Sequence, residues 1–177
     1  MGPIAGLTAL FNYKEDDPPA KLIKALKYQS AKDSVQVWQK LFYDYFVSHT
    51  LEWVSKDEQI VLLPVPLHPR RERERGFNQS LLLAIQAAES LTALGYAARV
   101  EKAVLVRIKN TMQQARLGKE DRAHNLERAF IAYPPPPTGR IVLVDDVYTT
   151  GSTLSECARA LGTVGIPKVW GLVGARG

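Results

Sequence analysis

The sequence contains a single cysteine, Cys157, so the chain can form no internal disulfide and cannot assemble a cysteine-rich zinc site. It also lacks a long apolar run. The longest, at residues 60–67, is far shorter than the roughly 20 residues that a membrane-spanning helix needs. No basic and then apolar signal stands at the amino terminus, so the cytoplasm is the expected location and no membrane span is expected.

The net charge of +5 is concentrated in two segments. Residues 68–77 hold four arginines against two glutamates, and residues 99–128 hold eight lysines or arginines against four acidic residues. The rest of the chain is close to neutral. Such a distribution indicates local anion-binding sites rather than a generally basic surface. Both DNA and a phosphorylated small molecule fit this interpretation.

Apolar strands alternate with amphipathic helices along the chain, which predicts an α/β fold with a mostly parallel sheet covered on both faces. We expect a helical, hood-like segment at residues 1–56 and a core domain at residues 57–177. Residues 1–17 are loosely patterned, and residues 109–127 predict a long loop. One predicted helix begins at Pro18, and the others span residues 33–49, 78–94 and 152–163. The predicted strands span residues 59–67, 100–108, 128–132, 140–146 and 168–174.

Residues 141–153, IVLVDDVYTTGST, contain the strongest chemical signal in the sequence. An apolar strand ends at two adjacent carboxylates, Asp145 and Asp146, and ligands of parallel sheets bind beyond the carboxyl ends of the strands. The small, hydroxyl-rich turn that follows precedes a helix, whose N–H groups and dipole favour a phosphate. Because carboxylates accept hydrogen bonds from sugar hydroxyls or bind a metal through water, this segment predicts a ribose 5-phosphate site.

A purely structural explanation is that the two aspartates cap a turn while Thr149 or Ser152 caps the helix. A nucleotide P-loop is excluded because no Gly-Lys-Ser/Thr ending is present. A phosphorelay receiver domain carries its aspartate pair on the first strand and needs further strands after it, whereas one predicted strand follows Asp146 here.

The segment VLVDDVYTTGST resembles the phosphoribosyl-diphosphate (PRPP) motif of type I phosphoribosyltransferases. Residues 64–79, PVPLHPRRERERGFNQ, are in addition similar to the ComF/GntX family of bacterial competence and DNA-utilisation proteins, and the resemblance covers roughly residues 10–177. A spaced set of residues shares this similarity: Arg107, Thr111, Gln114, Leu117, Arg122, Asn125 and Phe130. Members of the family commonly begin with a four-cysteine zinc module, for which this sequence lacks the cysteines, so zinc is not expected.

The resemblance implies a type I phosphoribosyltransferase fold, a twisted and mostly parallel sheet flanked by helices with a small helical hood. It implies that Asp145 and Asp146 hold the ribose hydroxyls and form the catalytic set with Arg75. It assigns the 5-phosphate to Thr149, Thr150, Gly151, Ser152 and Thr153. It assigns the pyrophosphate to Arg70, Arg71, Arg73 and Arg75, on a loop of residues 68–75 after the first core strand. It places Arg107, Thr111, Gln114 and Arg122 on a flexible loop that closes over the diphosphate. Mg²⁺ is expected to arrive with PRPP, without metal ligands from the protein.

The arginines of residues 70–75 support this assignment independently, since guanidinium groups match phosphate oxygens. Gly76 favours Arg75 in particular, because it allows the chain to turn inward there. The alternative is a solvated run of charges in which the arginines pair with Glu72 and Glu74.

The resemblance therefore implies a PRPP-binding, phosphoribosyltransferase-like protein that acts in DNA uptake, natural transformation or DNA utilisation. Nothing in the sequence identifies an acceptor nucleophile, so activity as a glycosyltransferase of nucleotide metabolism stays open. Two alternatives remain. One is a non-catalytic PRPP- or single-stranded-DNA-binding module that regulates a partner such as a DNA-translocating helicase. The other is a direct nucleic-acid binder whose arginines contact backbone phosphates.

Overall fold

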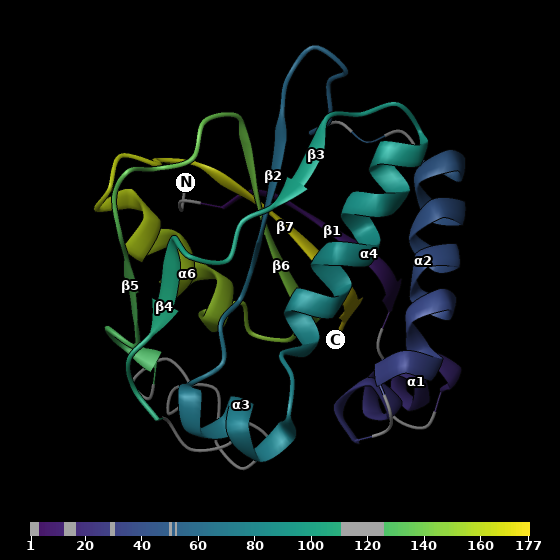
Figure 1. Cartoon of the computed structure of the whole chain (residues 1–177), viewed down its shortest axis with the longest axis horizontal. Helices are drawn as coiled ribbons and strands as arrows, with labels where there is room; N and C mark the ends of the chain where they lie inside the picture. Colours follow the sequence, from purple (N-terminus) through teal and green to yellow (C-terminus); the bar gives the residue numbers. More distant parts are fainter. Residues whose placement is uncertain (1–3, 13–16, 29–30, 50, 52, 111–125) are drawn as a thin grey trace.

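A five-stranded sheet in the order β1-β7-β6-β2-β3 organises the chain, and all four of its strand pairings are parallel. The computed structural model describes residues 4–12, 17–28, 31–49, 51, 53–110 and 126–177 (Figure 1). The strands of this sheet are β1 (Ile4–Asn12), β2 (Ile60–Pro64), β3 (Ala98–Val100), β6 (Arg140–Tyr148) and β7 (Val169–Arg176). The helices are α1 (Pro18–Tyr28), α2 (Ala31–Ser48), α3 (Pro69–Arg75), α4 (Gln79–Ala93) and α6 (Ser152–Gly162). The mostly parallel α/β architecture predicted from the sequence is confirmed.

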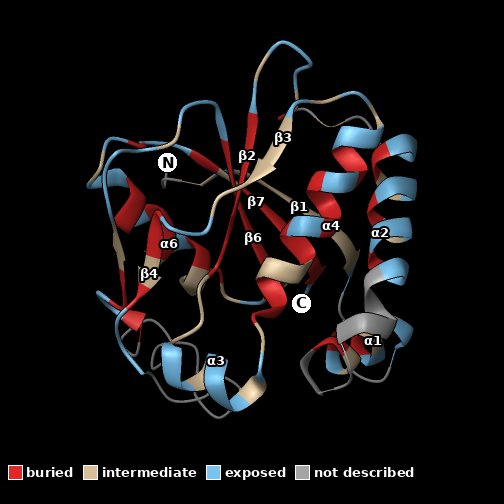
Figure 2. Cartoon of the chain, in the orientation of Figure 1, coloured by how far each residue is buried: buried red, intermediate tan, exposed pale blue. Residues whose placement is uncertain are grey.

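Each face of the sheet carries its own hydrophobic cluster because side chains alternate along a strand. On one face, Leu62 and Val144 pack with α1, α2 and α4. On the other, Leu63 and Leu143 pack with α6 and with the segment around Phe130. The central strands β2, β6 and β7 are therefore buried on both sides, as Figure 2 shows by their mostly red colour, whereas β1 and β3 at the edges are of intermediate burial. This explains why β2 and β6 are continuous apolar runs rather than alternating ones.

The amino-terminal segment differs from the expectation of a loosely patterned start followed by helices. Residues 4–12 form β1, which pairs with β7 from Ile4↔Val169 to Asn12↔Arg176 and lies at one edge of the sheet. Ile4 and Leu7 pack against the cluster on the α6 face, and Phe11 against the one on the α4 face. The segment 1–56 thus contributes a strand to the sheet as well as helices. Sequence reasoning missed β1 because its apolar residues do not alternate with charged ones.

A second, two-stranded antiparallel sheet is formed by β4 (Leu105–Arg107) and β5 (Phe130–Ala132). The single strand predicted over residues 100–108 is therefore wrong: β3 ends at Val100 and belongs to the main sheet, whereas β4 belongs to the small one. A turn separates them, in which the Glu101 carboxylate accepts a hydrogen bond from the Ala103 N–H at 3.0 Å. That turn redirects the chain across the α6 face.

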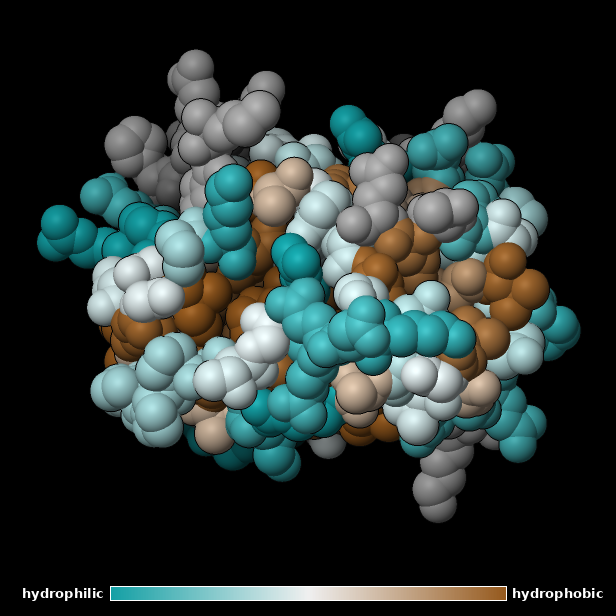
Figure 3. Space-filling model, turned by 90° about the horizontal axis from the view of Figure 1, so that it is seen from above, coloured by the Kyte–Doolittle hydropathy of each residue, from teal (hydrophilic) through white to brown (hydrophobic). Residues whose placement is uncertain are grey.

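The outer surface mixes residue types. In the view of Figure 3, hydrophilic residues extend across the middle, with hydrophobic patches on either side. None of the helices in the described part of the chain is long and apolar enough to cross a membrane.

The packing of α2 predicts a measurable difference between two of its residues. Phe42 is fully buried in the cluster on the α4 face, whereas Val47 is 61% exposed. Phe42→Ala should lower the free energy of unfolding by about 3–5 kcal/mol, because it leaves a cavity. Val47→Ala should change it by less than about 0.5 kcal/mol. Urea denaturation followed by circular dichroism and by tryptophan fluorescence measures both. Two separate transitions would show that the helices do not share a core with the sheet.

Candidate functional site

The strand order of the sheet reverses between β2 and β6, and the candidate site lies at this point. From β2 the chain continues through α4 to β3 on one side, and from β6 through α6 to β7 on the other. The two helices lie on opposite faces of the sheet. In open α/β sheets such a topological switch point leaves a crevice beyond the carboxyl ends of the strands, where ligands bind. Figure 1 shows α3 beneath these strand ends.

Asp145 and Asp146 lie at this point. On the β2 side, ladder pairing of β6 ends at Pro64↔Val144, while on the β7 side it continues to Tyr148. The two carboxylates therefore follow the last residue that β2 covers. They are 8% and 7% exposed, and each accepts a hydrogen bond from the next N–H of the chain: Asp146 N–H to Asp145 Oδ1 at 2.9 Å and Val147 N–H to Asp146 Oδ1 at 3.0 Å. Two adjacent buried carboxylates are costly for a fold, which makes this position the candidate functional site.

The pKa of Asp145 is raised to about 7, first by burial and then by the neighbouring Asp146 carboxylate. Hydrogen bonds from the Asp146 N–H and the Ser80 hydroxyl act in the opposite direction. The same cluster contains Cys157 of α6, whose pKa burial raises well above its usual value, and Arg107 of β4. Burial lowers the pKa of Arg107, and so does the nearby Arg71.

The turn after β6 has the geometry expected of a phosphate cradle. Gly151 is the N-cap of α6 with φ 77°, and a Cβ there would lie 2.5 Å from the Tyr148 Oη, so a glycine is required. Gly151 supplies no side chain to cap the helix. The Thr150 and Ser152 hydroxyls are 2.8 Å apart and line the same turn. Backbone N–H groups, hydroxyls and the helix dipole thus converge at one place.

The arginines of residues 70–75 lie on a short helix, α3, and not on the loop that we expected. His68 is its N-cap and accepts the Arg70 N–H at 3.2 Å, Pro69 occupies the first turn, and Gly76 ends it with φ 84°. The helix divides the four arginines. Arg71 and Arg75 are half-buried, whereas Arg70 and Arg73 are exposed. Arg70 pairs with the Glu74 carboxylate at 3.0 Å, as the charge-run interpretation predicted.

The junction between α3 and α4 connects these arginines to the aspartates. Arg75 donates a hydrogen bond to the Gln79 side chain. Asn78 caps α4 by accepting the Ser80 N–H at 2.9 Å, and its amide donates to the Val65 carbonyl at 3.1 Å. The Ser80 hydroxyl donates to Asp145 Oδ1 at 2.9 Å. Sequence reasoning missed Asn78 and Ser80 as site residues, although Asn78 lies within the segment 64–79 that resembles the family and Ser80 follows it directly.

Arg107, which we expected on a closing loop, lies on β4 and is 6% exposed, with its guanidinium 5.4 Å from the centre of the Phe130 ring. It is held inside the protein beside the aspartate cluster. The other residues assigned to that loop, Thr111, Gln114 and Arg122, lie outside the described residues.

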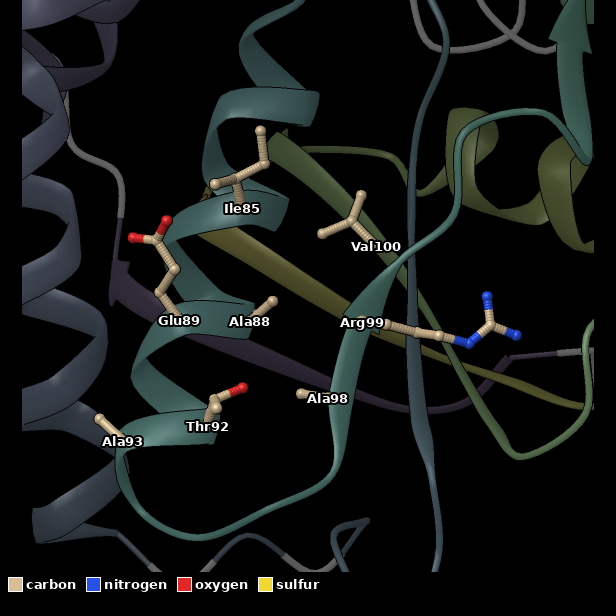
Figure 4. A pocket seen from close by; sticks show the side chains of 8 residues that line it. All are labelled: Ile85, Ala88, Glu89, Thr92, Ala93, Ala98, Arg99 and Val100. Carbon is tan, nitrogen blue, oxygen red and sulfur yellow. The ribbon is translucent and has the colours of Figure 1, made fainter.

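A groove of about 540 Å³ lies away from this site, between the carboxyl-terminal half of α4 and β3 (Figure 4). Ala88 and Thr92 of α4 point toward β3 and Val100 points back toward α4, while Arg99 points away. Its apolar lining does not suit a phosphate. Within the part of the chain that the structure describes, no group of three or more His, Cys, Asp or Glu side chains could hold a metal ion.

The described site therefore consists of two carboxylates on β6 just beyond its pairing with β2, a phosphate-type turn and a flanking arginine helix on a mostly parallel α/β sheet, in agreement with the type I phosphoribosyltransferase fold that the sequence predicts. No family model matches the sequence. The chain is 38% identical to Competence protein F of Haemophilus influenzae over 119 residues, 64% of this chain and 50% of that protein. It is 33% identical to Competence protein ComFC of Bacillus subtilis over 150 residues, 84% and 55% respectively.

The DNA utilization protein YhgH of Escherichia coli K12 is 31% identical over 144 residues, which are 81% of this chain and 61% of that protein. The chain belongs to the ComF family, as the motifs of residues 64–79 and 142–153 predicted. It spans little more than half of the length of these curated relatives.

The raised pKa of Asp145 predicts a pH-dependent cost to stability. A carboxyl group whose pKa is higher in the folded than in the unfolded state destabilises the fold progressively as pH rises from about 4 to about 7. Asp145→Asn removes this titration and keeps an oxygen for the Ser80 and Asp146 donors. The variant should therefore gain stability relative to the wild type across that pH range and level off above it.

Urea unfolding at pH 4, 5, 6, 7 and 8 measures the difference. The exposed Asp57 provides the control, because Asp57→Asn should show no comparable rise. A difference for Asp145→Asn that stays flat with pH would show that this carboxyl group titrates normally.

Proposed function

We propose that the protein binds Mg-PRPP at the β2–β6 switch point and acts, as a phosphoribosyltransferase-like protein, in the uptake or utilisation of DNA. The observation that carries the proposal is the buried pair Asp145 and Asp146 directly followed by a glycine-capped, hydroxyl-rich helix start. A sugar that carries a phosphate on its 5-position matches this sequence of groups. The role in DNA metabolism is supported by the names of the relatives, two competence proteins and a DNA utilization protein.

In this proposal, each part of the site has a binding role. The two carboxylates accept hydrogen bonds from the ribose 2- and 3-hydroxyls. The first-turn N–H groups of α6 and the hydroxyls of Thr150 and Ser152 hold the 5-phosphate. Arg71 and Arg75, the half-buried arginines of α3, neutralise charge on the diphosphate. Mg²⁺ bound to the diphosphate supplies further positive charge as the leaving group departs.

Transfer would pass through an oxocarbenium-like state, as glycoside cleavage does. The chain contributes the electrostatic complement: carboxylates beside the ribose and guanidinium groups beside the departing pyrophosphate. Release of pyrophosphate when a purine or pyrimidine base is added to the Mg-PRPP complex would identify a transferase. Tight binding without release would support the regulatory module instead.

The aspartate pair provides the direct test of ligand binding. The double variant Asp145→Asn, Asp146→Asn should lower the affinity for Mg-PRPP by at least about 100-fold, because two charge-assisted acceptors are lost. Isothermal titration calorimetry measures the affinity, and circular dichroism checks the fold. Asp57→Asn is the control for loss of one negative charge. A double variant that binds Mg-PRPP as tightly as the wild type would show that these aspartates do not bind the ribose.

The division of the arginines on α3 makes a second prediction. Replacing the half-buried pair, Arg71→Ala with Arg75→Ala, should weaken Mg-PRPP binding about 10- to 100-fold. The matched exposed pair, Arg70→Ala with Arg73→Ala, removes the same charge from the same helix and should weaken it less than about fivefold.

The opposite ranking would contradict a diphosphate site at Arg71 and Arg75. If the exposed pair also controlled binding of single-stranded DNA with a steep dependence on salt, the direct nucleic-acid binder would be favoured.

A further inference from the structure

We propose that Ser80 is a positioning residue of the proposed PRPP site, which holds the Asp145 carboxylate in the orientation that receives the ribose hydroxyls. The inference rests on the proposed function, and it assigns to α4 a part in a site that sequence reasoning built from β6, α6, the arginine segment and the loop residues of 107–122.

The hydrogen bond between the two side chains is well defined. Ser80 is 1% exposed and its hydroxyl donates to Asp145 Oδ1 at 2.9 Å. The same oxygen also accepts the Asp146 N–H at 2.9 Å. Two donors on one oxygen fix the plane of the carboxylate. The Asp146 side chain is a further hydrogen-bonding neighbour of Asp145. A free carboxylate would instead rotate about its Cβ–Cγ bond, since that torsion is broad.

The position of Ser80 is itself fixed. It occupies the first turn of α4, where its N–H donates to the Asn78 cap, and Asn78 is anchored through its amide to the Val65 carbonyl just beyond β2. Arg75, the last residue of α3, is bound to Gln79, the residue before Ser80. The serine hydroxyl is therefore held between the end of β2 and Asp145 of β6, at the switch point.

The charged and titratable groups around Asp145 show what Ser80 adds. Asp146 faces it from its own strand, Arg107 from β4 and Cys157 from α6. From α4 the neighbour is Ser80, a neutral donor. The hydroxyl stabilises the ionised carboxylate without placing a second cation beside it, so that the positive charge of the ligand-bound metal is not opposed.

The test compares Ser80→Ala with Ser80→Thr and with Ser90→Ala. Ser90 is a matched control: it lies on the same helix, is 1% exposed, and donates its hydroxyl to the Gln86 and Gln39 carbonyls instead. Affinity for Mg-PRPP is measured by calorimetry from pH 5.5 to 9. Because Asp145 must be ionised to accept from the ribose, binding should fail toward low pH.

Ser80→Ala should move the midpoint of this failure upward by about one pH unit. Ser80→Thr, which keeps the hydroxyl, should restore the wild-type midpoint, and Ser90→Ala should leave it unchanged. A stability loss in Ser80→Ala without a shift of the midpoint would overturn the proposal and make Ser80 a packing residue.

A second measurement separates this inference from the proposed function. Carboxyl ¹³C chemical shifts report the titration of Asp145 in the ligand-free protein, with Asp145→Asn used for assignment. An upward shift of the Asp145 titration in Ser80→Ala supports the positioning role even if the wild type fails to bind Mg-PRPP, which would end the proposed function alone. An unchanged titration overturns the role of Ser80 whatever the protein binds.

Discussion

Parallel pairing of β2 with β6 is the constraint on which the rest of the site depends. It brings together two segments far apart in the sequence, in the register Ile60↔Arg140 to Pro64↔Val144. The chain leaves β2 toward α4 and leaves β6 toward α6, on opposite faces of the sheet, so the ends of the paired segments form the topological switch point. The aspartate pair lies at this point, and the start of α4 is joined to it by the Ser80–Asp145 hydrogen bond.

The energetic cost of the site is concentrated on Asp145. Burial and the adjacent Asp146 both oppose its ionisation, and they are only partly offset by donors from Ser80 and the backbone. A position chosen for stability alone would carry an apolar residue, as Val142 and Val144 do on the same strand. The two buried carboxylates are consistent with the proposed ligand, which would supply hydroxyl donors and positive charge when it binds.

The α3–α4 junction gives a physical meaning to the segment RERERGFNQ. Gly76 ends α3 with a positive φ, Asn78 caps α4 and ties it to the end of β2, and Gln79 receives Arg75. The segment thus forms a fixed junction between two helices and also carries charge. Its glycine, asparagine and glutamine fix the position of Arg75 relative to Ser80.

The sequence by itself determined the fold class, the buried strands β2, β6 and β7, and the pairing of carboxylates with a phosphate-type turn, because these depend on local periodicity and on neighbours along the chain. The tertiary structure alone decided which arginines are half-buried, since helix α3 leaves Arg70 and Arg73 exposed and Arg71 and Arg75 partly covered. It also decided that residues 4–12 join the sheet, that Arg107 is buried beside the aspartates, and that Ser80 contacts Asp145. Each of these outcomes depends on contacts between distant segments, and no local pattern encodes which segments will meet.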